Sequence, residues 1–186
     1  MKRVNDIFYS LQGEGRNTGR AAIFIRFSGC NLKCPFCDTD FSSYREMTDD
    51  EIVNKIARYP SHFVVLTGGE PTLQVDAALI EALHSHGYEI AMESNGTIVP
   101  PAGVDWLTVS PKQNPVVKRC NELKCLFDES GDVNDFGIIA DYYYLQPCDV
   151  GEAERNHLIT QKCIEYIKNH PRWSLSLQTH KLMGFK

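Results

Sequence analysis

The residues of this chain that are best suited to metal chemistry are three closely spaced cysteines in one short loop, Cys30, Cys34 and Cys37. Tetrahedral sulfur sites usually take four donors, whether the metal is structural zinc or the iron of a cluster. A cubane iron–sulfur cluster held by only three cysteines leaves one iron able to bind a small molecule. The loop therefore favours a 4Fe-4S cluster that takes part in a reaction.

Other uses of these cysteines fit the sequence less well. Zinc sites usually take cysteines as paired C-x-x-C units, and no second pair follows, although His62 or another distant side chain would remain as a fourth ligand. Disulfides are disfavoured because the cysteine count is seven, an odd number, and no apolar signal sequence follows Met1. A reducing, cytoplasmic location is expected. The other cysteines are predicted to be mostly inert small side chains: Cys120, Cys125, Cys148 and Cys163.

The cysteine loop follows a segment with the composition of a buried strand, Ala21–Phe27. Six further strands are predicted from β-branched and aromatic runs, at residues 63–66, 88–92, 106–109, 122–127, 142–145 and 173–177. Thr48 and Glu51 form a capping box, which predicts a helix that ends at Pro60. Further helices are predicted at residues 73–86, around 132–140 and at 153–169.

This alternation predicts an α/β fold, an abbreviated and partly open (β/α) barrel of about six parallel strands. The 186 residues suit a single domain, with the cluster loop at 30–39 and a C-terminal strand and tail at 173–186. Functional loops of such sheets follow the carboxyl ends of the strands. Six polar loops do so here, at residues 30–39, 67–71, 93–97, 110–112, 146–147 and 178–181.

Charge and hydropathy exclude some classes of partner. The chain has 19 basic and 24 acidic residues and a net charge of −5, which argues against direct binding to nucleic acid. Its apolar runs have the length of strands, so no interaction with a membrane is expected. A small-molecule substrate is the remaining expectation.

Two motifs together resemble those of the radical S-adenosylmethionine (radical SAM) superfamily. They are the C-x-x-x-C-x-x-C spacing at one strand end and Gly68-Gly69-Glu70-Pro71 at a later one. The resemblance implies that a 4Fe-4S cluster on Cys30, Cys34 and Cys37 binds and cleaves SAM. Gly68 and Gly69 lack a Cβ, so their backbone is able to turn sharply and approach a ligand closely.

Over nearly the whole chain, the sequence also resembles the 7-carboxy-7-deazaguanine synthase family (QueE family). The matching segments are Leu11-Gln12-Gly13-Glu14-Gly15, Arg26, Cys37-Asp38-Thr39 and Gln178-Thr179-His180-Lys181. Members of that family are radical SAM lyases that convert 6-carboxy-5,6,7,8-tetrahydropterin to 7-carboxy-7-deazaguanine with loss of ammonia, in queuosine and deazapurine biosynthesis. They also use magnesium.

This resemblance assigns residues to three ligands. The pterin is expected to contact Leu11, Gln12, Gly13, Arg26 and Thr67. Arg26 suits a substrate carboxylate because a guanidinium forms a bidentate pair with it. SAM is expected to contact Gly69, Glu93, Asn95, Ser110, Pro111, Lys112, Gln146, Pro147, Cys148 and Asp149. Thr39 is expected to offer its hydroxyl to Mg²⁺, which prefers oxygen ligands.

His180 and Lys181 are the candidate catalytic residues for proton transfer, since histidine titrates near neutral pH. Binding of substrate is the alternative role for His180. The resemblance also implies a homodimer and a flavodoxin or ferredoxin-type electron donor. Two other functions stay open at this point: a glycyl-radical-enzyme activase, which shares the cysteine spacing, and a non-catalytic zinc-binding module.

Overall fold

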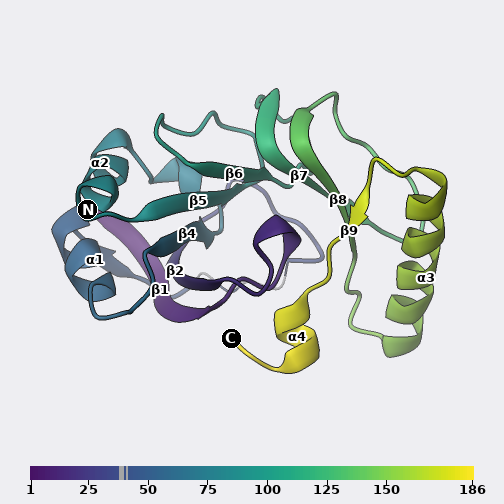
Figure 1. Cartoon of the computed structure of the whole chain (residues 1–186), viewed down its shortest axis with the longest axis horizontal. Coiled ribbons are helices and arrows are strands. Elements are labelled where there is room, and N and C mark those ends of the chain that lie inside the picture. Colours follow the sequence, from purple (N-terminus) through teal and green to yellow (C-terminus); the bar gives the residue numbers. More distant parts are fainter. Residues whose placement is uncertain (38–39, 41) are drawn as a thin grey trace.

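One open sheet forms the centre of the molecule. The computed structural model describes residues 1–37, 40 and 42–186, and within them nine strands pair in the order β3-β1-β2-β4-β5-β6-β7-β8-β9 (Figure 1). The strands are β1 Lys2–Leu11, β2 Ala21–Phe27, β3 Arg45–Met47, β4 Phe63–Gly68, β5 Glu89–Ser94, β6 Trp106–Val109, β7 Arg119–Phe127, β8 Ile139–Pro147 and β9 Ser174–Leu175. Strands β2 and β4 to β9 pair in parallel, which confirms the partly open barrel.

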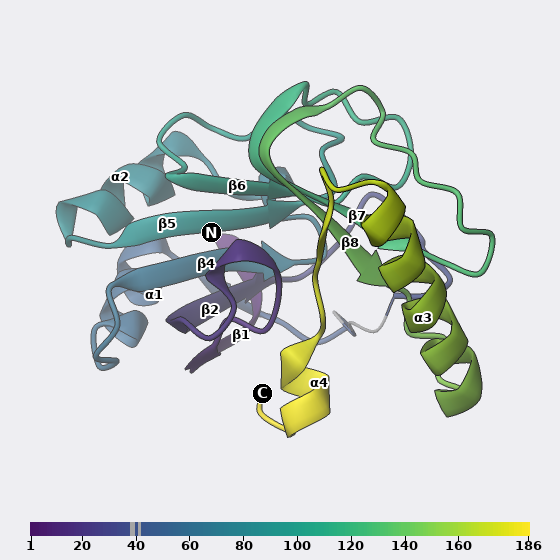
Figure 2. The same cartoon turned by 45° about the vertical axis from the view of Figure 1, so that its right-hand side comes forward.

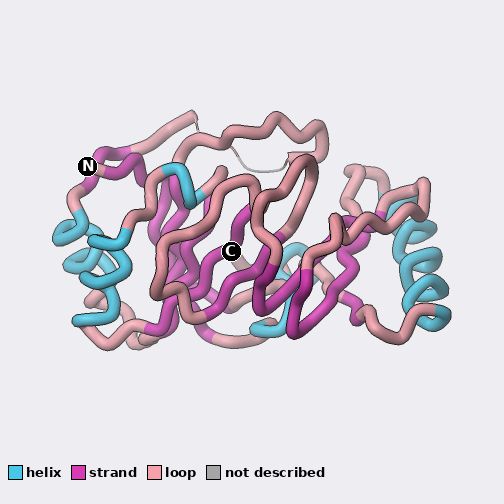
Figure 3. The backbone as a smooth tube through the Cα atoms, turned by 90° about the horizontal axis from the view of Figure 1, so that it is seen from above, coloured by secondary structure: helices cyan, strands magenta, loops and turns pink. Residues whose placement is uncertain are grey.

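The main helices pack on one face of this sheet. Helices α1 (Asp49–Ile56) and α2 (Ala77–Ser85) lie at one end of the molecule and α3 (Ala153–Asn169) at the other (Figures 1 and 3). Their buried side chains join those of the strands in one core, through residues such as Ile56, Leu83 and Cys163. Thr48 caps α1 with the predicted capping box to Glu51. No helix among the described residues is long and apolar enough to cross a membrane.

On the other face of the sheet, the side chains change from apolar to polar along the strands. Successive side chains of a strand point to opposite faces, so Ile23 and Ile25 join the helix-side core while Phe24 faces the opposite side. There Phe24 packs with Phe63 and Val65 in a small apolar cluster. Toward the carboxyl ends of the strands the residues become polar, as at Arg26, Thr67, Glu93, Lys124 and Gln146. The polar part of this face is where a ligand site is expected.

Several elements differ from the sequence-based predictions. Strands β1 and β3 were not predicted, and they pair antiparallel at one edge of the sheet. The helix predicted around 132–140 is wrong, because that segment forms tight turns in which Asn134 and Asp135 accept hydrogen bonds from nearby backbone N–H groups. Phe136 and Gly137 there have positive φ angles, 51° and 67°, which end any helix.

The connections on either side of β6 and between β7 and β8 contain no α-helix, although all three join parallel strands. They run through residues 95–105, 110–118 and 128–138. Each spans its parallel pair of strands without the helix that such a crossover usually contains. The last predicted strand shortens to Ser174–Leu175, and helix α4 (Thr179–Met183) begins where a loop was expected. In Figure 2 the chain runs from β9 down to α4, beside the loop that follows β1.

Candidate active site

Two cavities open on the polar part of the sheet. The first has a volume of about 450 Å³, and the second has a volume of about 480 Å³. Both volumes fall in the range of small-molecule sites. The first cavity is lined by the cysteine loop and by the ends of β4 to β8, and the second by β1, β2 and the C-terminal tail. Most residues predicted to bind SAM line the first cavity, and the residues predicted to bind the pterin line the second.

The first cavity contains the cysteines together with the residues predicted to bind SAM. Cys30, Cys34 and Cys37 line it, and so do Gly69, Glu93, Asn95, Ser110, Lys112, Gln146, Pro147, Cys148 and Asp149. Of the predicted SAM residues, Pro111 alone is not part of this lining, and it is buried. Every cysteine of the chain is a thiol rather than half of a disulfide.

The three cysteines of the loop supply the free thiols that an iron–sulfur cluster takes as ligands. A cubane cluster takes one thiolate on each of three separate irons, so its cysteines need not meet at a point. The loop around Cys34 and Cys37 turns on itself through a hydrogen bond from Cys37 N to Cys34 O of 3.1 Å. Because all three cysteines line the first cavity, a ligand bound there would lie next to a cluster on them.

Gly68 and Gly69 join the end of β4 to the start of the cysteine loop. Gly69 N donates to Phe27 O at 3.0 Å, and Glu70 N donates to Gly29 O at 2.9 Å. A Cβ on Gly69 would stand 1.9 Å from Gly29 O, and one on Gly68 would stand 2.2 Å from Phe27 O. Both glycines are therefore required by the close approach of two backbones, in addition to any contact with a ligand.

Glu70 stabilises the segment after β4 through hydrogen bonds to its buried side chain. Its side chain is fully buried and accepts hydrogen bonds from Thr72 N and Oγ1, Ser94 Oγ and Asn95 N, at 2.6–3.1 Å. These donors come from the turn after Glu70 and from the end of β5. Glu70 thus ties the end of β4 to the loop after β5, and its role in this structure is structural.

Asn95 contacts the cysteine loop directly. Its Nδ2 donates to Asn31 Oδ1 at 2.9 Å, and Asn31 Nδ2 donates to Thr97 Oγ1 at 2.7 Å. Thr97 in turn donates from its backbone N and its Oγ1 to Asn95 Oδ1. The Asn95–Thr97 turn therefore positions the segment between Cys30 and Cys34, and Asn95 also lines the first cavity.

The second cavity collects the residues predicted to bind the pterin. Leu11, Gln12, Gly13, Arg26 and Thr67 all line it, together with His180 and Lys181. The guanidinium of Arg26 lies 5.4 Å from the ring centre of Phe8, which stacks on Phe24 at 4.9 Å. A cation beside two aromatic rings suits a flat, acidic ligand.

The first and last predicted motifs meet at this cavity. Thr179 N and Thr179 Oγ1 donate to Gly13 O at 3.0 and 2.8 Å. The His180 ring lies directly against Gly13, because a Cβ on that glycine would be 2.4 Å from His180 Nδ1. Residues 165 or more positions apart in the chain therefore form one wall of the second cavity.

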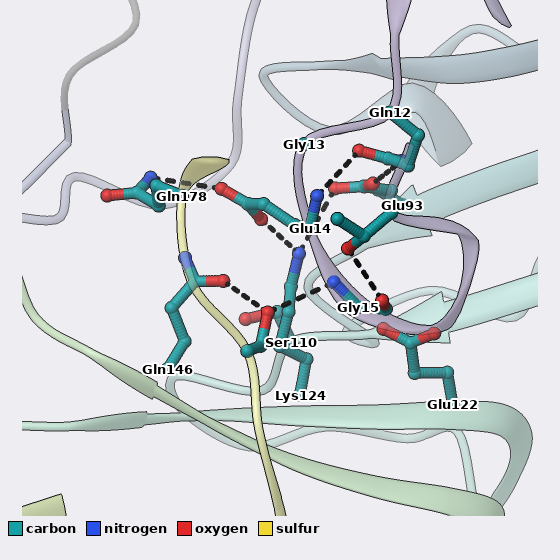
Figure 4. Close-up of polar contacts among 12 residues, drawn as sticks. Gln12, Gly13, Glu14, Gly15, Glu93, Ser110, Glu122, Lys124, Gln146 and Gln178 are labelled. Carbon is teal, nitrogen blue, oxygen red and sulfur yellow. Dashed lines mark hydrogen bonds and ion pairs between the residues drawn. The ribbon is translucent and has the colours of Figure 1, made fainter. Parts of the chain in front are cut away.

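Five residues line both cavities and are called the shared wall below: Glu14, Thr67, Glu93, Gln178 and Lys181. Next to them Lys124 lines the first cavity; it is buried and forms an ion pair with Glu14 and a second one, at 3.5 Å, with Glu93 (Figure 4). Gln12 Nε2 donates to Glu93 Oε1 at 2.8 Å, and Gln178 Nε2 donates to Glu14 Oε1 at 3.0 Å. The carboxylates of the wall are thus held from both sides.

Burial and charge set the protonation of this group. Burial acts to raise the pKa of Glu14, but the charge of Lys124 and the hydrogen bonds from Lys124 and Gln178 keep it below the usual value. Burial acts to lower the pKa of Lys124, but the charges of Glu14 and Glu93 raise it. Burial raises the pKa of the neighbouring Glu122. Glu14 and Lys124 are therefore both ionised at neutral pH.

Two other lysines border the first cavity. Burial, with the charge of Lys124 added, lowers the pKa of Lys112 to about 8, and Lys112 Nζ donates to Ser110 O at 2.9 Å. Lys181 Nζ pairs with Asp149 Oδ2 at 3.0 Å. A backbone hydrogen bond from Gly151 and the pairing with Lys181 lower the pKa of Asp149 to about 2. Lys181 therefore connects the C-terminal tail to the loop after β8.

Glu14, Glu70, Lys124 and Gln178 were not among the predicted site residues. Lys124 had a signal in the sequence, because a lysine within the otherwise apolar end of a buried strand requires a partner. Glu14 and Gln178 lay inside motifs of which only some members were assigned a role: Leu11, Gln12 and Gly13 in the first, and His180 and Lys181 in the last. Thr39, the predicted magnesium ligand, lies outside the described residues, as does Asp38.

The chain is similar to known radical SAM proteins over most or all of its length. The sequence profile of the Radical SAM superfamily matches residues 24–113. A 7-carboxy-7-deazaguanine synthase of Bacteroides thetaiotaomicron is 47% identical over the full length of both chains, and one of Bradyrhizobium diazoefficiens is 42% identical over 98% of each. Among solved structures, QueE from Escherichia coli matches with a TM-score of 0.79 and 27% identity, over 95% of this chain and 93% of that one.

Proposed function

Because this chain belongs to the 7-carboxy-7-deazaguanine synthase family of radical SAM enzymes, we propose that it makes 7-carboxy-7-deazaguanine from 6-carboxy-5,6,7,8-tetrahydropterin with release of ammonia. It is an enzyme of deazapurine biosynthesis that acts on a small molecule and uses a 4Fe-4S cluster and SAM. The full-length similarity favours this function over a glycyl-radical-enzyme activase or a zinc-binding module.

The observation that best supports this function is the pair of cavities with a shared wall. The cysteines of the first cavity would hold the cluster, and the loops after β5, β6 and β8 would bind SAM. When bound, the cluster and SAM supply a carbon radical that removes a hydrogen atom from the substrate. A substrate in the second cavity would lie beside the first, across Thr67 and Glu93. Proximity of this kind is what hydrogen transfer requires.

The residues of the second cavity suit the chemical groups of the substrate. Arg26 would pair with its carboxylate, since a guanidinium presents two parallel N–H donors. Gln12 and the carboxylates of the shared wall would accept hydrogen bonds from the N–H groups of the pterin ring. His180, against Gly13, would bind the substrate or move a proton to it. The proposal places Lys181 beside it, as a further group able to hold a proton.

The most direct test is anaerobic reconstitution of the enzyme with iron and sulfide, followed by addition of SAM, reductant, magnesium and the carboxytetrahydropterin. The expected results are a brown protein and a product with the mass of 7-carboxy-7-deazaguanine, with ammonia formed in equal amount. An intact cluster that cleaves SAM without forming this product would contradict the proposal. The proposal also includes a flavodoxin or ferredoxin-type electron donor, a homodimer and a cytoplasmic location. Activity with flavodoxin or ferredoxin as the reductant tests the first point, gel filtration the second and cell fractionation the third.

Replacing Thr39 by alanine tests the proposed magnesium site. Loss of a hydroxyl ligand is expected to raise the magnesium concentration needed for half-maximal product formation about tenfold. SAM cleavage in the absence of pterin is expected to persist, because the cysteines are unchanged. The control is Ser42→Ala, which removes an exposed hydroxyl from the same segment. The same magnesium requirement in Thr39→Ala and the parent enzyme would argue against this ligand.

Replacing Gly13 by alanine tests the second cavity as the pterin site. The new Cβ would stand 2.4 Å from His180 Nδ1, so the ring must move within the cavity. We expect binding of 6-carboxypterin, measured by equilibrium dialysis, to weaken about tenfold, because a small displacement of a binding group is costly. Gly137→Ala is the control, since Gly137 lines neither cavity and a Cβ there meets no atom within 4 Å, although its φ of 67° makes alanine less stable at that position. Equal affinities in both variants would argue against a role for this wall.

A further inference from the structure

Lys124 is the one cation that touches both carboxylates of the shared wall in the described part of the chain. Its side chain is only 5% exposed; it lines the first cavity but contributes no atom to the second, whereas Glu14 and Glu93 line both. The two glutamates come from different parts of the fold, Glu14 from the loop after β1 and Glu93 from the end of β5. A single ammonium on β7 therefore connects two separate segments (Figure 4).

The hydrogen bonds around this ammonium fix the direction of each carboxylate. One oxygen of Glu14 accepts a hydrogen bond from Lys124 Nζ, and the other accepts one from Gln178 Nε2. In the same way, one oxygen of Glu93 accepts from Lys124 Nζ and the other from Gln12 Nε2. Each carboxylate still has acceptor capacity, since a carboxylate oxygen carries two lone pairs. The arrangement leaves two oriented carboxylates that face the ligand space.

We infer that Lys124 is a positioning residue for substrate binding, which orients the carboxylates of Glu14 and Glu93 as acceptors for N–H groups of the pterin. The inference rests on the proposed function, because that function supplies the N–H donors. Lys124 acts through the two glutamates and does not itself touch the substrate. Its neighbour Glu122, two residues earlier on the same strand, faces the same group and accepts from Arg16 N at 3.0 Å.

The pH dependence of this group has a definite sign. The charged and titratable groups that act on Glu14 are Lys124, His180 and Lys112, and Glu93 and Glu122 act on the same Lys124. Without Lys124, burial remains and raises the pKa of Glu14, so this carboxyl would gain its proton at a higher pH. Affinity that depends on an ionised Glu14 would then fall as the pH is lowered, over a range in which the parent enzyme still binds.

The test measures binding of 6-carboxypterin by equilibrium dialysis, with the reconstituted enzyme and SAM but without reductant, so that no turnover occurs. At pH 7.5 we expect Lys124→Met to weaken binding about 10- to 100-fold, the loss that follows when a hydrogen bond to a charged group is removed. Between pH 8 and pH 5.5 its affinity should fall with a midpoint above that of the parent. An affinity equal to the parent's, or an unshifted midpoint, would overturn the inference.

A double-mutant cycle separates positioning from a general loss of structure. Lys124→Met alone leaves Glu14 buried without a cation, and this risks unfolding. Glu14→Gln, and the double variant Lys124→Met/Glu14→Gln, contain no such isolated charge. If Lys124 acts partly through Glu14 and partly through Glu93, Lys124→Met should weaken binding less in the Glu14→Gln background than in the parent, with the remaining loss due to Glu93. Losses that simply add would overturn the inference.

Lys2 provides a matched control. It is also a buried lysine paired with two carboxylates, Asp49 at 2.6 Å and Asp76 at 3.1 Å. It lies at the start of β1, beside the first turns of α1 and α2, and lines neither cavity. Lys2→Met is expected to lower stability and leave 6-carboxypterin binding unchanged; an equal loss of binding in this variant would overturn the inference. Failure of the parent enzyme itself to bind would overturn the proposed function, and the inference with it.

Discussion

Replacement of Gly69 by alanine is expected to reduce product formation at least about 100-fold, because a misplacement of about 1 Å at a reacting centre has effects of this size. The added Cβ would stand 1.9 Å from Gly29 O and 2.5 Å from Gly29 C, which are backbone atoms that cannot rotate away. The end of β4 and the start of the cysteine loop must separate. Their hydrogen bonds at Phe27 O and Gly29 O would be lost or lengthened.

This displacement reaches the cluster ligands through a single peptide bond. Gly29 precedes Cys30, so a shift of its carbonyl moves the first of the three cysteines. We therefore expect the reconstituted variant to hold less iron and to show weaker absorbance near 400 nm than the parent. The prediction is specific to the cluster region, since Gly69 is not among the glycines with positive φ and its replacement brings no strain of that kind.

Gly87→Ala is the matched control for this prediction. Gly87 has a φ of 78°, so alanine there costs about 1 kcal/mol of stability, but its Cβ would meet no atom within 4 Å. This variant should be less stable than the parent and keep its iron content and activity. Full iron content and full activity in Gly69→Ala would show that the contact with Gly29 is not needed to hold the cysteine loop.

The sequence predicted the central strands well because their apolar patterns are strong. Ala21–Phe27 and Trp106–Val109 were predicted with the bounds that the structure has, as was the helix Ala153–Asn169. Such segments are buried against several neighbours, so local preference and tertiary packing agree. The helix from Thr48 was predicted by its capping box, which satisfies backbone donors locally and needs no distant partner.

Strand β1 could not be predicted by the same reasoning. It contains polar residues such as Asn5, Asp6 and Ser10, and it becomes a strand because β2 and β3 pair with its backbone on both sides. The helix predicted around residues 132–140 failed for the opposite reason. Its Asn and Asp side chains hydrogen-bond the nearby backbone and so compete with a helix.

For the candidate site, the motifs gave the residues but not their arrangement. That Leu11–Gly13 and His180 share one cavity depends on hydrogen bonds from Thr179 to Gly13 O, a contact that neither motif contains by itself. The shared wall likewise depends on Lys124, whose partners lie 31 and 110 residues away. Interactions over such separations leave no periodic pattern in a sequence, and only the folded chain brings them together.

Glu70 is the clearest case of a motif residue whose role came from the structure, and Glu70→Gln is expected to destabilise the enzyme by about 2–4 kcal/mol. The carboxylate accepts four hydrogen bonds, including one from Asn95 N at 2.7 Å, and is fully buried. A glutamine in its place would direct an NH₂ group at one of these donors and leave it without an acceptor. The melting temperature should fall by about 4–16 °C for a chain of this size.

The same substitution should also weaken the cluster site, because Glu70 holds the turn whose Asn95 contacts Asn31 of the cysteine loop. The exposed carboxylate of Glu81, on α2, gives the control Glu81→Gln, for which no change in melting temperature or iron content is expected. If Glu70→Gln melts like Glu81→Gln, the four hydrogen bonds contribute little net stability. In that case the conformation of the loop after β4 must be held by its glycines and its backbone contacts to Phe27 and Gly29.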